Sequence, residues 1–150
     1  MNKLMTSLFA GIAAAVAIGI LAYTDVAQEQ MILVMAPFGA SAVLVFGVPD
    51  SPLAQPKNVI LGRLLTAFIG IVFTQYIGVN PMMMAIATGL GITGMLSTNT
   101  THPPAGANPM LIMMAGQSWS FLITPVLVGS VAIVAVGMVH KKLRKELAIA

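Results

Sequence analysis

The sequence contains no cysteine and very few charges. Seven Lys and Arg and four Asp and Glu make up only 7% of the 150 residues, whereas about a quarter of a soluble domain is charged. The lack of cysteine excludes disulfides, thiol catalysis and cysteine-ligated metals. The formal net charge of +3 does not indicate a nucleic-acid partner, because four basic residues form a short tail at positions 141–145.

Most of the chain is hydrocarbon. Hydrophobic residues account for 58% of it, and its mean hydropathy is +0.96. This composition predicts an integral membrane protein with a single transmembrane domain over residues 1–150. The sequence has no nucleotide-binding glycine loop, no paired carboxylates and no Ser/His/Asp set. We therefore expect no enzymatic activity, no cofactor and no metal site.

Four apolar runs are predicted to cross the bilayer as helices. They cover residues 4–23, 59–79, 82–96 and 119–139. Two other apolar segments, at 31–48 and around Pro104, are interrupted by proline and glycine. We predict an all-α polytopic protein with four full spans and two short or re-entrant segments. If both broken segments cross instead, there are six crossings, which Lys57 and Arg63 favour because their loop would then be cytoplasmic.

The two broken segments resemble each other. A shift of 67 residues aligns Pro37-x-Gly39-Ala40 with Pro104-x-Gly106-Ala107 and continues without a gap to Gly70 and Gly137. The pattern predicts two repeats of span, broken segment and span, with compositional bias as the alternative. Both arrangements place the two termini on one side. The basic tail predicts that this side is the cytoplasm, and a site for anionic lipid or a partner is its other interpretation.

Prolines followed by small residues predict helix starts whose backbone N–H groups are open to an anion. In transporters, paired broken helices of this kind form the substrate site. The alternative is that the two prolines only kink helices. The candidate substrate-binding residues are Phe38, Gly39, Ala40 and Ser41 in the first segment, and Asn99, Thr101, His102, Pro104, Ala105, Gly106, Ala107 and Asn108 in the second.

Three polar residues have more than one interpretation. His102 either donates a hydrogen bond or a proton to a substrate, or only caps a helix by bonding a backbone carbonyl. Arg63 lies about one turn inside its span, and we expect it to snorkel to the surface or pair with Asp50. Substrate contact by Arg63 is the alternative, so Arg63 and Asp50 are predicted as gating or accessory residues.

The run from Thr101 to Pro109, Thr-His-Pro-Pro-Ala-Gly-Ala-Asn-Pro, resembles the signature of the HPP family of membrane proteins. The earlier run from Ala36 to Leu44 and the proline-rich run from Pro49 to Asn58 also resemble that family. The resemblance implies a small integral membrane protein, usually described with four spans. Certain plastid and cyanobacterial members are associated with nitrite transport, and many members are bacterial. The resemblance supplies no set of binding residues.

Together these features predict a transporter or channel for a small inorganic anion, with nitrite as the leading candidate. The alternatives are a channel or carrier for a small neutral or protonated solute, and a scaffold protein that transports nothing. We expect the lipid bilayer and a small anion as partners, and a bacterial inner membrane as the location. A small-residue face at Gly11, Ala15 and Gly19 packs either within the chain or between copies in a homo-oligomer.

Overall fold

The computed structural model describes residues 3–27 and 35–149, and within them every regular element is helical. The prediction of an all-α membrane protein is confirmed. The α-helices are α1 (Lys3–Ala27), α2 (Ala36–Ala42), α3 (Pro56–Val72), α4 (Pro81–Ser97), α5 (Asn108–Ala115) and α6 (Val128–Ile149). The π-helical or 3₁₀ turns between them are η1 (Val43–Gly47), η2 (Pro52–Ala54), η3 (Phe73–Ile77), η4 (Pro103–Ala107) and η5 (Leu122–Leu127).

Three stretches of helix are long and apolar enough to cross a membrane. They are Lys3–Tyr23, Pro56–Ile77 and Leu122–Leu147. The predicted span at 82–96 forms α4, whose 17 residues reach about 26 Å, at the short end of what a bilayer requires. Pro81 occupies the first turn of α4, and the Asn80 side chain accepts a hydrogen bond from the Met83 N–H at 2.9 Å. A cap of this kind fixes where the span begins.

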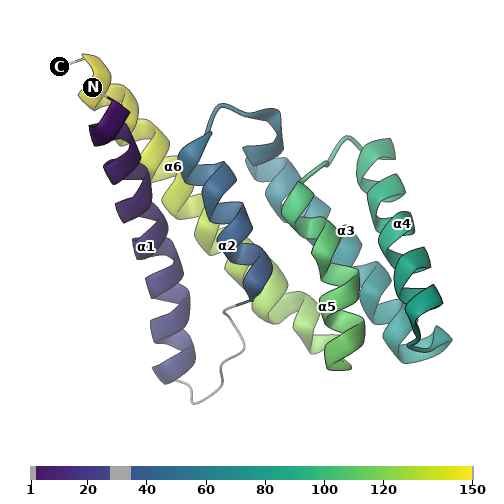
Figure 1. Ribbon diagram of the computed structural model, residues 1–150. Coiled ribbons are helices and arrows are strands. Elements are labelled where there is room, and N and C mark those ends of the chain that lie inside the picture. The colour runs from purple at the N-terminus through teal and green to yellow at the C-terminus, as the bar shows by residue number, and fades with distance from the viewer. Residues whose placement is uncertain (1–2, 28–34, 150) are drawn as a thin grey trace.

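The two broken segments each run in one direction and do not turn back. The first forms α2 and η1 in sequence, and the second forms η4 and α5 (Figure 1). Residues 31–34, where the first segment was expected to begin, lie outside the described residues. Helices α1, α3 and α5 point one way and α2, α4 and α6 the other, so the two chain ends lie together. The alternating directions fit the six-crossing arrangement, which remains a prediction because α2 and α5 have only 7 and 8 residues.

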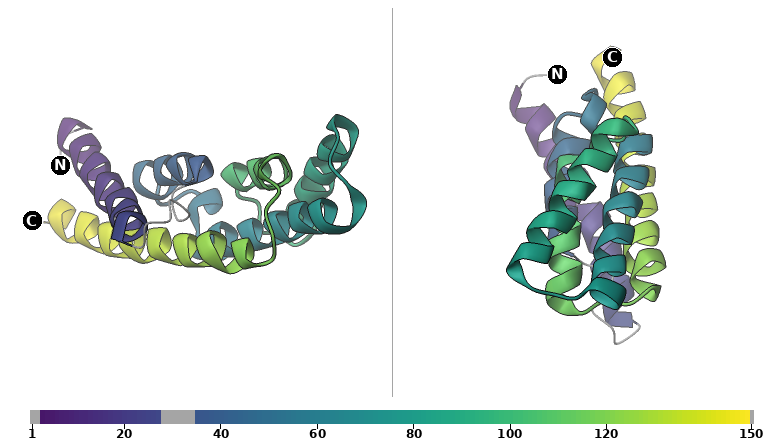
Figure 2. Two further views of the ribbon diagram at one scale, coloured as in Figure 1. Left: turned by 90° about the horizontal axis from the view of Figure 1, so that it is seen from below. Right: turned by 90° about the vertical axis from the view of Figure 1, so that its right-hand side faces the viewer.

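The short helices occupy the middle of the molecule. Seen end-on, α2 and α5 lie next to each other between α1 and α4, and α3 and α6 form a layer across them (Figure 2). The largest buried apolar side chains come from both layers: Phe38, Phe46, Val59, Ile71, Ile112, Met113, Val126 and Ile133. The core therefore lies between the two short segments and the two long helices.

Glycines in the long helices let the short helices approach closely. A Cβ added at Gly70 would lie 2.9 Å from the Pro109 Cα and 3.3 Å from Ile112. A Cβ added at Gly137 would overlap Val45. Gly137 lies 67 residues after Gly70, and Ile112 lies 67 residues after Val45. The two contacts are therefore equivalent at the 67-residue shift seen in the sequence. The contacts fit an inverted duplication, which remains a prediction.

Helix α1 is the least enclosed element, with 11% of its spanning window buried. Its Ala17 and Leu21 join the core, and the Phe9 ring stacks on His140 of α6 at 4.8 Å between centroids. A Cβ at Gly11 or Gly19 would meet no atom within 4 Å. The small-residue face of α1 therefore makes no close contact with the rest of the described chain, and its use between copies stays a prediction.

Candidate functional site

Arg63 is the centre of the polar part of the structure. It lies seven residues after the start of α3, which places it about 10 Å along the helix axis, and 0% of its surface is exposed. The expectation that Arg63 snorkels is therefore wrong. Its side chain points inward because Gly62, Arg63 and Thr66 lie on the face of α3 that α2 and the second broken segment cover.

The Arg63 guanidinium reaches the first broken segment. Its Nη2 donates to the Pro37 carbonyl oxygen at 2.6 Å and to the Ser41 hydroxyl at 2.5 Å. Its central carbon lies 4.5 Å from the centre of the Phe38 ring, a distance at which an aromatic face attracts a cation. Helix α2 thus supplies two acceptors and a ring, and none of these groups carries a negative charge.

The remaining N–H groups of Arg63 are unsatisfied. Nε and Nη1 are buried and have no hydrogen-bond partner. The expected pairing with Asp50 is also wrong, because Asp50 lies 3.1 Å from Lys141 Nζ instead, and that lysine lowers the Asp50 pKa by a hydrogen bond and by its charge. Within the described residues no carboxylate pairs with Arg63. A buried cation of this kind costs folding energy and typically marks a functional position in a membrane protein.

His102 connects the second broken segment to the first. Its Nδ1 lies 2.8 Å from the Leu53 carbonyl oxygen, and its Nε2 lies 2.6 Å from the Ser41 hydroxyl. Because a carbonyl can only accept, Nδ1 carries the proton and a neutral Nε2 accepts from Ser41. Ser41 in turn accepts from Arg63. The result is a directed chain of hydrogen bonds from Arg63 through Ser41 and His102 to the loop before α3.

This chain requires a neutral His102. The imidazole is buried in the linker between α4 and η4, and burial lowers its pKa to about 4, with the positive charge of Arg63 acting in the same direction and the bond to Leu53 opposing it. Both ring nitrogens are engaged. The geometry therefore supports the capping interpretation of His102, in which the ring bonds a backbone carbonyl and positions Ser41.

Asn108, from the second broken segment, contacts the backbone of Arg63. Its Nδ2 donates to the Arg63 carbonyl oxygen at 3.3 Å and to the Thr66 hydroxyl at 3.1 Å. Its Oδ1 is buried without a partner. Ser41 and Asn108, one from each broken segment, thus both lie against the same turn of α3. The site offers unpaired donors on Arg63 and an unpaired acceptor on Asn108.

Several predicted residues lie away from this cluster. Asn99 is exposed and adopts a φ of 53° in the turn after α4, a left-handed conformation that asparagine tolerates. Thr101 contributes only its carbonyl, which accepts from Asn58 at 3.0 Å. Gly39 and Ala40 face outward, and Gly106 and Ala107 are half-exposed. Pro104 and Ala105 are buried.

The start of the second segment differs from the expected helix terminus. Pro103 to Ala107 form a 3₁₀ turn, and the α-helix begins only at Asn108. The Ala105 N–H, which was expected to face an anion, donates to the His102 carbonyl at 2.9 Å. The cause is local, because two successive prolines supply no N–H groups and the turn closes on the first available donor.

The sequence reasoning missed Thr66 and the Leu53 carbonyl. Thr66 follows Arg63 by three residues, and this spacing places the two on one helix face, so the pattern itself could have indicated it. The Leu53 carbonyl carries no side-chain signal. Its position depends on the folding of the proline-rich loop, where the Ser51 side chain accepts from the Leu53 N–H at 3.3 Å.

Comparisons with known proteins agree with an integral membrane protein. The model of the HPP transmembrane region matches residues 1–148. Two Dictyostelium discoideum proteins, each named a transmembrane protein, are 35% identical over 132 residues and 38% identical over 125 residues. These alignments cover 81% and 78% of this chain but 42% and 44% of the relatives, so the chain spans less than half their length. No solved structure matches the chain. The chain belongs to the HPP family, and it forms that family's transmembrane region.

Proposed function

We propose that this chain moves a small inorganic anion across the membrane and that Arg63 attracts the anion. The observation that carries the proposal is the burial of Arg63 without a carboxylate partner among the described residues and with Nε and Nη1 unpaired. Three N–H bonds on these two atoms are available to acceptor atoms of a ligand. A bound anion would satisfy them and neutralise the charge.

The surroundings of Arg63 favour weak, reversible binding of one negative charge. The Pro37 carbonyl, the Ser41 hydroxyl and the Phe38 ring stabilise the guanidinium with dipoles and a π-face. A carboxylate would have cancelled the charge permanently. Transport requires a site that is favourable enough to fill and weak enough to empty, and a cation held by neutral groups meets both requirements.

Nitrite is the leading candidate for the anion. It carries one charge and has two oxygens that accept hydrogen bonds, and the resemblance to family members associated with nitrite transport points to it. The activity of the longer relatives is not carried over. The chain is a transporter in this proposal and not an enzyme, its termini face the cytoplasm by the positive-inside rule, and the membrane is a bacterial inner membrane.

An internal duplication would explain why two broken segments reach one arginine. In an inverted repeat each half contributes a discontinuous helix to a shared central site. The alternating helix directions and the matched contacts of Gly70 and Gly137 support this proposal. Ser41 and Asn108, which are equivalent at the 67-residue shift, both contact the same part of α3.

The test is nitrite uptake into proteoliposomes that contain the purified full chain. We expect uptake by wild type, loss of uptake in Arg63→Gln and partial uptake in Arg63→Lys, which keeps the charge but presents it differently. The matched control is Lys57→Gln, which removes an exposed positive charge from the start of the same helix. Equal uptake by wild type and empty liposomes would contradict nitrite transport.

The alternatives predict different behaviour in the same vesicles. Flux of an anion alone depends on the membrane potential, whereas flux of nitrous acid or another neutral solute does not. A scaffold that transports nothing shows no flux of either kind. The engagement of both His102 nitrogens is the observation that favours the scaffold, since it shows a polar cluster partly closed by the protein's own groups.

A further inference from the structure

A pair of cavities lies away from Arg63, between the last turns of α6 and the loop that follows η1. The first has a volume of about 180 Å³. Its wall is largely apolar and includes Val45, Val134 and Met138, and Lys141 supplies its positive charge. Val45 and Val134 are buried, whereas 62% of Met138 is exposed, so the cavity opens from the core toward the outer surface of α6.

The second cavity adjoins the first, since Pro49 lines both. Its volume is about 230 Å³, and its wall is formed by Arg144 and by loop residues that include Val48, Asp50 and Ser51. Lys141 and Arg144 lie almost one turn apart on α6, so each cavity has one cation from the same side of the helix. A largely apolar cavity thus adjoins one that contains both a cation, Arg144, and a carboxylate, Asp50.

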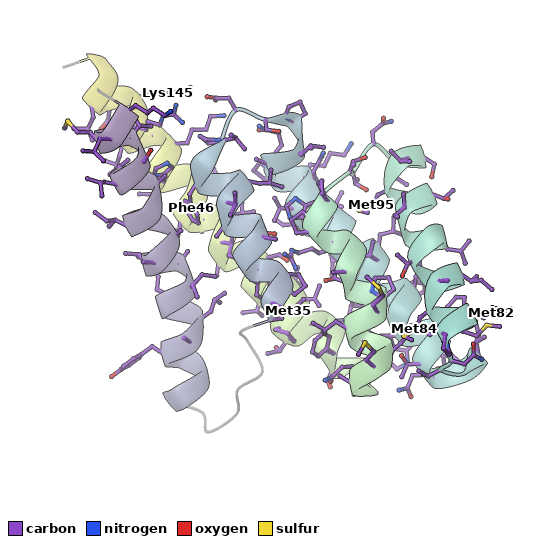
Figure 3. All side chains as sticks on the ribbon, in the orientation of Figure 1. Met35, Phe46, Met82, Met84, Met95 and Lys145 are labelled. Carbon is purple, nitrogen blue, oxygen red and sulfur yellow. The ribbon has the colours of Figure 1, made fainter. Side chains whose placement is uncertain are left out.

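Positive charge is in excess at this position. Asp50 pairs with Lys141 at 3.1 Å, and Arg144 and Lys145 are close enough for their charges to act on the same carboxylate. Within the described part of the chain neither Arg144 nor Lys145 has an ion-pair partner. Lys145 lies at the end of the molecule where both chain termini meet (Figure 3). Three cations therefore surround one carboxylate.

The position along α6 matches the boundary of a bilayer. The apolar part of this helix ends at Val139, and the basic residues follow within six positions. At that depth the phosphates of lipid headgroups lie above their acyl chains. A ligand that fits both cavities must carry a negative group next to an apolar chain.

We propose that the two cavities bind one anionic glycerophospholipid, with its phosphate at Arg144 and Lys141 and part of an acyl chain against Val45, Val134 and Met138. The two chambers match the two parts of such a lipid. The excess of basic residues selects an anionic headgroup over a zwitterionic one. The site is separate from Arg63, so it does not depend on what the protein transports.

The experiment is native mass spectrometry of the full chain in detergent with equal amounts of dioleoyl phosphatidylglycerol and dioleoyl phosphatidylcholine. We expect retained phosphatidylglycerol to exceed phosphatidylcholine severalfold. Arg144→Gln should lower that ratio about fivefold, the effect expected for one cation near a lipid surface. Lys142→Gln removes the same charge from an exposed position that lines neither cavity and should leave the ratio unchanged.

Three outcomes would overturn the proposal. Equal retention of the two lipids excludes selection of the headgroup. An equal loss in Arg144→Gln and Lys142→Gln attributes binding to general surface charge. Stabilisation of wild type by inorganic phosphate alone, to the same extent as by phosphatidylglycerol, identifies free phosphate as the ligand.

The apolar chamber has its own pair of variants. Met138→Gln places a polar group in the chamber and should reduce retention of phosphatidylglycerol severalfold. Met82→Gln is the matched control, because Met82 is 69% exposed on the far side of the molecule from Lys145 (Figure 3). Equal retention in these two variants would exclude an acyl chain from the cavity. All variants are compared only where their melting temperatures in lipid-free detergent match that of wild type.

Discussion

The two halves of the chain make equivalent contacts but carry different chemistry. Gly70 packs on Ile112, and Gly137 packs on Val45, each 67 residues from its counterpart. At the same 67-residue shift, Ser130 is the counterpart of Arg63, and both residues are 0% exposed. Ser130 donates to the Val126 carbonyl of its own helical turn at 2.5 Å, whereas Arg63 reaches across to α2. The matched glycine contacts occur in both halves, and the buried charge occurs in one half alone.

This difference places a buried charge at only one of two positions that correspond at the 67-residue shift. A serine satisfies its hydroxyl within its own helix and needs nothing from a neighbour. An arginine needs acceptors beyond its own helix, and Pro37 and Ser41 supply two of them. A second arginine at position 130 would add another buried charge and raise the cost of burial.

The largest expected effect is the loss of nitrite uptake on substitution of Arg63, with its equivalent position, Ser130, as the control. Arg63→Ser removes the buried charge and leaves the Pro37 carbonyl without its donor, so we expect nitrite uptake to fall more than tenfold. Ser130→Ala removes one hydrogen bond within a helix, worth about 1 kcal/mol, and should leave uptake close to wild type. Uptake rates in proteoliposomes with matched protein content measure both. Equal losses in the two variants would contradict the assignment of the charge to one half.

The sequence predicted the framework better than the site. Apolar length and proline placement predicted the long helices, the two broken segments and the shared end of the termini. They did not predict the non-helical backbone of Thr124 inside the expected span at 119–139. The inward direction of Arg63 was not predicted, because its position near the end of a span suggested snorkelling and only the packing of α2 against α3 encloses it. The 3₁₀ turn at Pro103 was missed for a related reason, since one proline opens a helix but two successive prolines delay it.

The second prediction concerns His102, which has no counterpart in the first half. Its pKa of about 4 in the folded protein lies below the ordinary value of 6.5. The neutral imidazole therefore stabilises the fold above pH 6.5, and this contribution is lost as the pH falls from 6.5 to 4. The shift corresponds to a free energy on the order of 3 kcal/mol.

Thermal unfolding in detergent between about pH 7.5 and 4 measures this effect. This range covers the pKa of His102 in the unfolded chain and roughly reaches its pKa in the folded protein. His102→Gln cannot titrate, so we expect its melting temperature to change less with pH than that of wild type. His140 is present in both proteins and cancels in the comparison. Parallel curves for the two proteins would show that His102 is not held neutral by the fold.

The third prediction tests the shared framework. Gly70→Ala and Gly137→Ala both force a Cβ into the opposite half, and each should destabilise the protein by about 1–3 kcal/mol, the usual cost of overpacking a core. Gly39→Ala is the control, because a Cβ at that position meets nothing within 4 Å and alanine favours a helix. Loss of stability in only one of the two glycine variants would contradict an equivalent role for the two contacts.

The smallest effect is expected at the Asp50–Lys141 pair, which joins the loop of the first half to the end of α6 in the second. The pair is exposed to solvent, with 75% of the Asp50 side chain accessible, and such pairs contribute little because water and salt screen them. Lys141 lowers the pKa of Asp50, so its stabilising effect is present at neutral pH and is lost as the pH falls through the lowered pKa. Asp50→Asn should therefore lower the melting temperature slightly at pH 7 and low salt, and high salt should abolish the difference.

Because Lys141 Nζ also donates to the Pro49 carbonyl at 3.3 Å, the loop keeps a contact with α6 in this variant. A large loss of stability in Asp50→Asn that persists in high salt would show that the ion pair itself holds the two halves together.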